Sequence, residues 1–90
     1  MERKPQEQLK KEIEEAKTKV EVGAKYFHYK HPDQFYKVLL IAIIEATETV
    51  SLIYQAEYGE KLIWVRPLSE FLSTATTPDG KEVARFTKVS

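Results

Sequence analysis

The first twenty residues carry apolar positions at helical spacing in a segment rich in Glu, Lys and Gln. The apolar residues recur every three or four positions: Leu9, Ile13, Ala16 and Val20. The surrounding residues are good helix formers, and Pro5 suits the first turn of a helix. The pattern predicts an amphipathic helix from residue 5 to about residue 20. Because its apolar stripe is narrow, the helix needs a surface to pack on, either its own domain or a coiled-coil partner.

From Lys25 onward the chain changes to aromatic and β-branched residues, which favour strands. Turn-forming residues divide this part and predict strands at 25–30, 35–44, 50–58, 62–66 and 83–89. The expected turns lie at 31–34, 46–49, 58–60 and 77–80. Pro67 should end the fourth strand, and residues 68–72 are expected to form a single helical turn.

Residues 36–58 are also compatible with one long helix, but their residue types and alternation favour strands. Apolar and polar side chains alternate from Val50 to Tyr58 with a period of two that only Ile53 breaks. Five short strands predict a mainly β fold with an N-terminal helix, either a small SH3-like five-stranded barrel or a curled antiparallel sheet. We expect residues 1–22 to form the helix and residues 23–90 the β domain.

The second predicted strand is apolar on both faces. Strict alternation places Val38, Leu40, Ala42 and Ile44 on one face, and Leu39, Ile41 and Ile43 on the other. A strand of a small barrel normally exposes one face to water, so something should cover the outer side. The N-terminal helix is one candidate for this cover, and a homodimer contact is the other.

Composition narrows the classes of function. The 14 basic and 14 acidic residues give a formal net charge of zero, so an overall affinity for nucleic acid is not expected, although a local patch is compatible with it. The absence of cysteine excludes disulfides, thiolate catalysis and cysteine-bound zinc. With no apolar leader and no apolar run of membrane-spanning length, we expect a soluble, cytoplasmic protein.

No motif for catalysis or cofactor binding is present in the sequence. The only histidines, His28 and His31, lie three residues apart and lack the further ligands that a metal site requires. No serine lies in a nucleophile-elbow motif, and the three glycines are too scattered to cradle a phosphate. We therefore expect no metal, no cofactor and no catalytic residue, although a carboxylate pair acting in acid–base chemistry stays open.

The aromatic and basic residues form the most informative set. Ten of the 90 residues are Phe, Tyr or Trp, and such rings either fill the core or line a binding groove. Alternation places Trp64 with Arg66 on one strand face, and Tyr26 and His28 with Lys30 on another. If these faces adjoin, rings and cations meet at a candidate ligand site comprising His28, Lys30, Tyr54, Gln55, Trp64 and Arg66. The structural alternative is that Arg66 pairs with Glu70 and Gln55 pairs across the sheet.

Six short motifs, in order, resemble one bacterial family, the domain of unknown function 1653. They are HYK (28–30), YKV (36–38), IA (41–42), YQAEYG (54–59), WVRPLSEF (64–71) and GKEVARF (80–86). The resemblance implies a strand pattern similar to SH3-like small barrels, and it implies no reaction, cofactor or ligand. Family members commonly carry His-Ser-Glu-Thr after the second strand, where this chain reads Ile44-Glu45-Ala46-Thr47. The charged N-terminal helix extends beyond the usual family unit.

These observations lead to three functional hypotheses. The first is a non-catalytic binding module that recognises a peptide, a nucleotide or single-stranded nucleic acid through the aromatic and basic residues. The second is a structural or assembly protein that acts as a homodimer through an apolar surface. The third is a small hydrolase-like enzyme that uses His28 with a carboxylate in a cleft.

Overall fold

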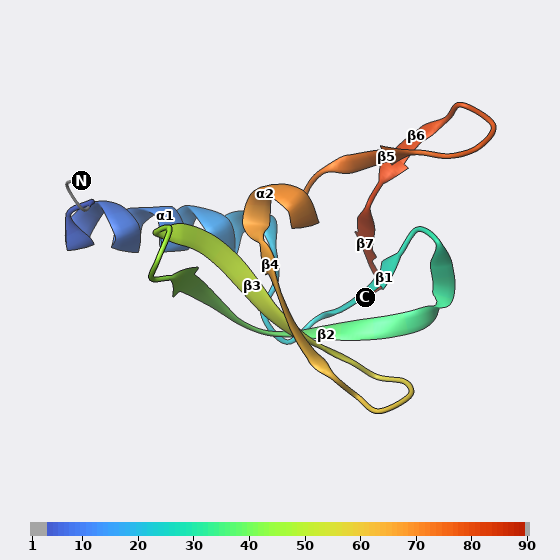
Figure 1. Ribbon diagram of the computed structural model, residues 1–90, viewed down its shortest axis with the longest axis horizontal. Helices are drawn as coiled ribbons and strands as arrows, with labels where there is room; N and C mark the ends of the chain where they lie inside the picture. The colour runs from blue at the N-terminus through green and yellow to red at the C-terminus, as the bar shows by residue number, and fades with distance from the viewer. Residues whose placement is uncertain (1–3, 90) are drawn as a thin grey trace.

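The computed structural model describes residues 4–89 and shows a helix packed on an open antiparallel sheet (Figure 1). The sheet has the strand order β4-β3-β2-β1-β7, and a separate two-stranded ribbon, β5–β6, projects away from it. The elements in chain order are α1 (Gln6–Lys19), β1 (Lys25–His28), β2 (His31–Ile44), β3 (Thr49–Ala56), β4 (Ile63–Pro67), α2 (Leu68–Phe71), β5 (Thr74–Thr76), β6 (Glu82–Ala84) and β7 (Phe86–Lys88).

The predicted mainly β architecture with an N-terminal helix is confirmed, but the predicted barrel is wrong. Strands β4 and β7 are the two edges of the sheet, and no pairing joins them within residues 4–89. An SH3-like barrel requires closure of this kind, and the backbone pairing stops short of it. The antiparallel sheet that the sequence left as the alternative is the observed form.

Two local predictions are also wrong: the turn expected at 31–34 and the uninterrupted strand expected at 83–89. The expected turn at 31–34 is part of β2, since β1 and β2 already turn at Tyr29 and Lys30, where His28 pairs with His31. The expected strand at 83–89 is interrupted at Arg85. The N–H of Arg85 donates to the carbonyl of Ser73, and its carbonyl accepts from the N–H of Tyr29. Arg85 is therefore the point where the chain leaves the ribbon and joins the sheet.

A β-bulge in β2 changes which side chains share a face. Val38 pairs with Tyr54 and Leu40 pairs with Ile53, so the register shifts around Leu39. An extra residue reverses the alternation beyond it. The strict alternation predicted for residues 38–44 is therefore wrong, and Ile41 rather than Leu40 follows Val38 onto the core face.

The core lies on one face of the sheet, and α1 covers part of it. Ala16 of α1 and Val20, the residue that follows the helix, are buried, and Val20 packs in one cluster with Val38 and Leu52. The helix thus belongs to the same core as the sheet and covers the core face. On the opposite face, Leu40, Ile63 and Val65 stay exposed. The expected cover for a second apolar face is not provided by the helix.

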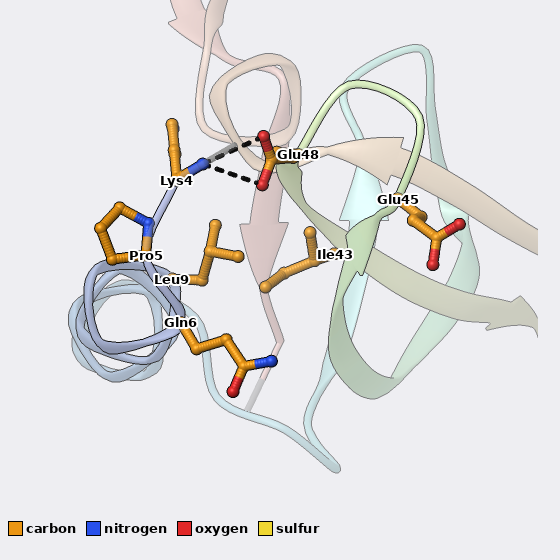
Figure 2. A pocket seen from close by; sticks show the side chains of 7 residues that line it. All are labelled: Lys4, Pro5, Gln6, Leu9, Ile43, Glu45 and Glu48. Carbon is orange, nitrogen blue, oxygen red and sulfur yellow. Dashed lines mark hydrogen bonds between the residues drawn. The ribbon is translucent and has the colours of Figure 1, made fainter. Parts of the chain in front are cut away.

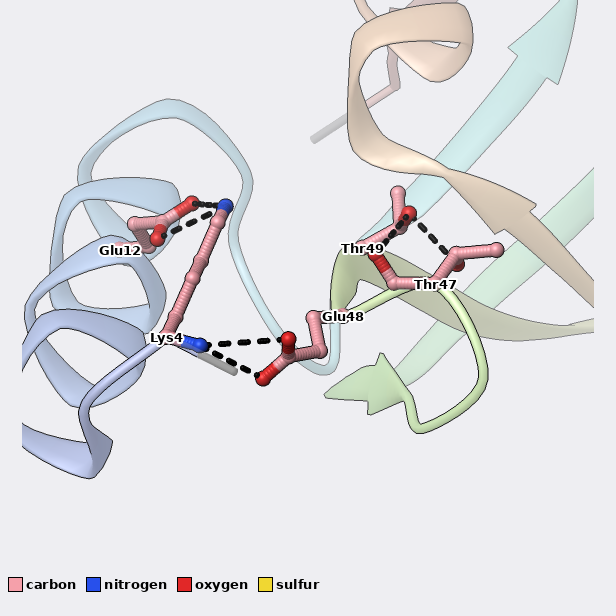
Figure 3. A network of polar contacts seen from close by, with 5 residues as sticks. All are labelled: Lys4, Glu12, Thr47, Glu48 and Thr49. Carbon is pink, nitrogen blue, oxygen red and sulfur yellow. Dashed lines mark hydrogen bonds and ion pairs between the residues drawn. The ribbon is translucent and has the colours of Figure 1, made fainter. Parts of the chain in front are cut away.

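The N-terminal end of α1 is attached to the turn between β2 and β3. The backbone N–H of Lys4 lies 3.2 Å from both carboxylate oxygens of Glu48, and the Nζ of Lys4 lies 3.3 Å from Glu12 (Figure 3). Nearby, the hydroxyl of Thr49 donates to that of Thr47 at 2.7 Å. A carboxylate beside a helix N-terminus is electrostatically favourable, so Glu48 helps to fix the direction of α1.

The core placement predicts unequal effects of two leucine truncations. Leu52 is fully buried, whereas Leu72 is exposed. Leu52→Ala should lower the free energy of unfolding by about 2–5 kcal/mol through lost burial and a residual cavity. Leu72→Ala should change it by less than about 0.5 kcal/mol. Urea unfolding followed by circular dichroism measures both, and equal effects would contradict this core.

Candidate functional site

A cavity of about 250 Å³ opens on the core face of the sheet, close to both of its edges. We call it the aromatic-basic pocket. It is lined by side chains from β1, β2, β3, β4, β7 and the β1–β2 turn: His28, Lys30, His31, Tyr36, Tyr54, Trp64, Arg66 and Phe86. Four of these eight side chains are rings of Phe, Tyr or Trp, two are histidines and two are permanent cations.

The strand register brings these side chains together. Tyr54 is the direct partner of Trp64 across β3 and β4. On the other side of the sheet, His28 is the partner of Phe86 across β1 and β7. Residues directly opposite in an antiparallel pair share a face of the sheet. The order of the strands then places the two pairs around Tyr36, whose ring contacts both Tyr54 and Phe86 edge to face.

Arg66 is held from three directions. Its Nε donates to the hydroxyl of Tyr54 at 3.2 Å, and its Nη1 lies 3.7 Å from a carboxylate oxygen of Glu70. Its guanidinium carbon lies 5.5 Å from the centroid of the Phe86 ring, a cation–π distance. A guanidinium has five N–H donors, so these contacts orient it and still leave donors for the pocket. The predicted pairing with Glu70 and the predicted pocket position therefore both occur.

His28 forms one side of the pocket in its neutral form. Its Nδ1 accepts a hydrogen bond of 3.2 Å from the backbone N–H of Lys30, which leaves the proton of a neutral ring on Nε2. Its ring meets Phe86 edge to face at 5.0 Å. Burial, followed by the nearby cations Arg66, Arg85 and Lys30, lowers the pKa of His28 below 6.5. The pocket thus holds a surplus of positive charge that disfavours one more proton.

Tyr36 contributes a polar group at the back of the pocket. Its hydroxyl lies 2.5 Å from the hydroxyl of Tyr58. Burial, together with the hydrogen bond to Tyr58, raises the pKa of Tyr36 to about 12. Its phenol therefore stays protonated at neutral pH and can act as a hydrogen-bond donor or acceptor but not as a base.

Five of the six predicted site residues line the aromatic-basic pocket, and Gln55 does not. Gln55 pairs with Lys37 and Ile63 in the sheet, and its side-chain amide donates to the carbonyl of Lys61 at 3.0 Å. Alternation along β3 turns it to the face opposite Tyr54. This is the structural alternative considered for Gln55, in which its side chain stabilises the β3–β4 hairpin.

Three pocket residues were absent from the predicted set: His31, Tyr36 and Phe86. Phe86 is buried in the core, but its side chain also lines the pocket. The tight turn at Tyr29 and Lys30 brings His31 back beside His28. The motif YKV contained the signal for Tyr36, because alternation sets Tyr36 and Val38 on one face before the bulge.

A second cavity, of about 590 Å³, lies between the N-terminal turn of α1 and the end of β2 (Figure 2). Leu9 and Ile43 face each other across it, and its polar groups include the carboxylates of Glu45 and Glu48. We call it the helix groove. It offers apolar walls and negative charge, and it lacks the convergence of rings and cations seen in the aromatic-basic pocket.

Residues 4–89 contain no group of three or more His, Asp or Glu side chains placed to hold a metal ion. Over the same residues, every helix is too short or too polar to cross a bilayer.

Comparison with known proteins assigns the chain to a family. The model of a family described as a protein of unknown function, DUF1653, matches residues 24–88, well over half of the chain. This chain is a member of the DUF1653 family. A solved structure agrees: a crystal structure of a DUF1653 protein from Bordetella bronchiseptica superposes with a TM-score of 0.65. Its sequence is 27% identical, over 76% of this chain and 86% of that chain. None of the curated proteins gives a match.

The DUF1653 match separates the two cavities. Every residue that lines the aromatic-basic pocket, from His28 to Phe86, lies inside the matched range 24–88. The helix groove takes four of its seven residues, Lys4 to Leu9, from the segment before that range. The aromatic-basic pocket is thus built wholly from the family unit, and we take it as the candidate functional site.

The pocket predicts an altered titration of His28. Its pKa, followed by the ¹³C and ¹H shifts of the imidazole, should lie below 6.5 because of burial and neighbouring cations. Arg66→Gln removes one of those cations, so it should raise the pKa of His28 toward 6.5. Lys88→Gln changes an exposed cation that pairs with Glu21 and is not among those that lower the pKa of His28, so it should leave that pKa unchanged. An unshifted pKa in the native protein would contradict the described environment.

The same shift predicts how acid affects folding. Because the pKa of His28 is lower in the folded state, the unfolded chain binds the proton more tightly. The contribution of His28 to stability is therefore fully present above pH 6.5 and is lost as the pH falls through the folded-state pKa. Urea unfolding at several pH values should show this loss, and His28→Gln should remove it. A pH profile that is identical in the variant would count against the prediction.

Proposed function

We propose that this DUF1653 protein is a non-catalytic binding module whose aromatic-basic pocket takes a nucleotide unit, either free or at the end of a single strand. The observation that carries the proposal is the composition of the pocket wall. Rings and cations from five strands converge on one cavity, and none of its eight lining side chains is a carboxylate. A ligand with a planar ring and a phosphate matches both features.

Trp64 supports this choice by its exposure. Half of its surface is exposed at the mouth of the pocket, although its partner Tyr54 is buried. An indole in this position offers a flat apolar face, and stacking of a base on such a ring contributes about 1–3 kcal/mol. The hydroxyl of Tyr54 accepts a hydrogen bond from Arg66 and so holds its guanidinium in place.

The positive charge of the pocket supports the phosphate of the proposed ligand. The chain as a whole is neutral, yet Lys30 and Arg66 both line this one cavity. Lys30 is exposed and can follow a phosphate, whereas Arg66 is oriented before any ligand arrives. A guanidinium can bind phosphate oxygens bidentately, and an exposed ammonium can bind them as a point charge. The neutral ring of His28 can donate a hydrogen bond from its Nε2–H without binding a second proton.

The size of the cavity limits the ligand. Pockets for drug-sized molecules measure roughly 300–1,000 Å³, and this one measures about 250 Å³. One ring with one phosphate fits such a volume, and a longer strand would have to continue outside it. The hydrolase-like alternative needs a carboxylate beside His28 in the cleft, and the pocket wall offers none.

A binding titration tests the proposal. Isotope-labelled protein is titrated with mononucleotides, the matching nucleosides, inorganic phosphate, a short single-stranded RNA and an acidic peptide. We expect shifts of the Trp64 indole and of the amides at residues 28–30 with mononucleotide at sub-millimolar concentration. Nucleoside or phosphate alone should bind more weakly. Tighter binding of the RNA than of the mononucleotide would identify the single strand as the ligand.

Substitutions locate the effect. Lys30→Gln should weaken mononucleotide binding by about tenfold, as expected for one lost charge-assisted hydrogen bond, and added salt should reduce the difference. Trp64→Leu should weaken it by about tenfold or more through lost stacking. Lys88→Gln, an exposed cation on β7 outside the pocket wall, is the matched control and should have no effect. Binding that is equal in all three variants, or a response only to the peptide, would refute the proposal.

A further inference from the structure

Strand β4 leaves one side of its backbone without a strand partner. Within residues 4–89 it pairs only with β3, so it forms an edge of the sheet (Figure 1). The N–H of Ala56 donates to the carbonyl of Leu62, which marks Leu62 as a residue bonded to β3. In an antiparallel ladder, bonded and non-bonded residues alternate. The N–H and C=O groups of Ile63 and Val65 therefore point to the open edge.

The position of Pro67 agrees with this alternation. Pro67 is the next residue in the series after Ile63 and Val65, and it pairs with Ser51 in a non-bonded position. A proline has no N–H, so it is tolerated only where that group would face away from the ladder. The open edge thus consists of two complete residues and ends at a proline, which suits a short added strand.

Positions 62–65, at the start of β4, carry no charged side chain that would protect this edge, and Arg66 and Pro67 follow only at the other end of the strand. Four successive apolar residues are each at least half exposed: Leu62 (55%), Ile63 (59%), Trp64 (50%) and Val65 (57%). Edge strands are usually protected by charged residues or by cover from another element. The opposite edge, β7, follows that rule, because it exposes Thr87 and Lys88. Leu40, also exposed, continues the apolar surface onto the open face of the sheet.

We infer that β4 is a self-association edge, on which β4 of a second copy of this chain pairs antiparallel about a two-fold axis at Trp64. This inference does not depend on the proposed function. In this register the open groups of Ile63 bond those of Val65 in the partner, and both copies use all the open groups of these two residues. Trp64 then faces Trp64 of the other copy in a non-bonded pair, where cross-strand side chains lie closest.

Charge and polarity support a second copy as the occupant. In this register Arg66 lies opposite Leu62 of the other copy, and Lys61 lies opposite Pro67, so no like charges are opposed. Residues 62–65 are all apolar, so the same residues of a second copy match them in polarity. The exposed parts of these side chains in two copies amount to on the order of 1,000 Å², and edge pairing buries only part of that area, which is below the usual size of a specific interface. The dimer is therefore weak and concentration-dependent.

Pairing of this kind would place a second indole at the mouth of the aromatic-basic pocket. Trp64 lines the pocket of its own chain. A Trp64 side chain from the second copy would stand beside it on the same face of the joined sheet. The two pockets of the dimer would then lie next to each other across the two-fold axis.

The test measures association and Trp contact together. Sedimentation velocity from micromolar to millimolar concentration should show a monomer–dimer equilibrium. The chain has a single tryptophan, so exciton coupling between indoles in the far-ultraviolet circular dichroism can arise only between copies. The exciton signal should grow with the dimer fraction. A monomer at every concentration, or a dimer without an indole signal, would overturn the inference.

Matched proline variants locate the interface. Val65→Pro removes an N–H that faces the open edge of β4 and makes no bond to β3. It should therefore raise the dimer dissociation constant at least tenfold. The thermal unfolding midpoint should stay close to that of the native chain. Lys88→Pro makes the equivalent change on β7 and should leave dimerisation unchanged. Ile63→Lys introduces like charges at the β4 edge and should abolish the dimer even if the proline variant folds poorly. Equal dimerisation of the native chain and Ile63→Lys would disprove the β4 edge.

The same variants separate this inference from the proposed function. Ile63 and Val65 do not line the aromatic-basic pocket. A monomeric Ile63→Lys variant that still binds mononucleotide would support both ideas. A native dimer that binds no nucleotide would refute only the binding module, and a native monomer that binds nucleotide would refute only the self-association edge.

Discussion

The ring of Phe86 connects the two ends of the sheet. It stacks on Phe71 at a centroid distance of 4.3 Å with an angle of 6° between the rings. The guanidinium of Arg66, from β4, makes a cation–π contact with the Phe86 ring. Phe86 comes from one edge strand and Arg66 from the other, so side chains bring together two edges that backbone bonds do not join. The aromatic-basic pocket lies between these two edges, because its wall includes Trp64 and Arg66 from β4 and Phe86 from β7.

Because of this, the core and the pocket share their residues. Tyr54 contacts Phe86 edge to face at 5.8 Å on one side and binds Arg66 through its hydroxyl on the other. A domain of this size has few rings to spare, and aromatic pairs contribute about 0.5–1.5 kcal/mol beyond their buried area. The groups that orient the cations of the pocket are therefore the groups that stabilise the fold. Lys30, His31 and Trp64, which stay exposed, are the pocket residues least tied to folding.

What could be predicted from the sequence depended on local patterns. The helix could be predicted because its apolar spacing and its residue types agree over fourteen residues. Five pocket residues were accessible because alternation alone places Trp64 with Arg66 and His28 with Lys30, and short hairpins keep neighbouring strands adjacent. For Gln55 the sequence left open a ligand contact and a pairing across the sheet, although adjacent residues of a strand face opposite ways and Tyr54 faces the pocket.

The failures share a different cause: each depends on pairing between distant segments. The bulge at Leu39 is visible only once β2 is aligned with β3, and one extra residue there exchanges the faces of the rest of β2. The break at Arg85 arises because its N–H and C=O bond to two different segments. Closure of the sheet depends on whether β4 meets β7, a contact of high sequence separation that no local pattern encodes.

The two faces of the sheet explain why the helix does not provide the cover expected for the outer face of β2. Strand β2 is apolar along both sides, which requires two covers, and α1 supplies one by packing on the face that carries Val38 and Leu52. The bulge sets Leu40 on the other face beside Ile53, in line with Val65 of β4. Had the sheet closed, β4 would have lost its open edge, although this face would still have been apolar. The edge and the face are exposed together only because closure is incomplete, and the same incomplete closure leaves the cavity that the rings and cations line. The pocket and the proposed association edge are thus two results of one arrangement, in which β4 is held by side chains on its inner face and, within residues 4–89, by no strand along its outer edge.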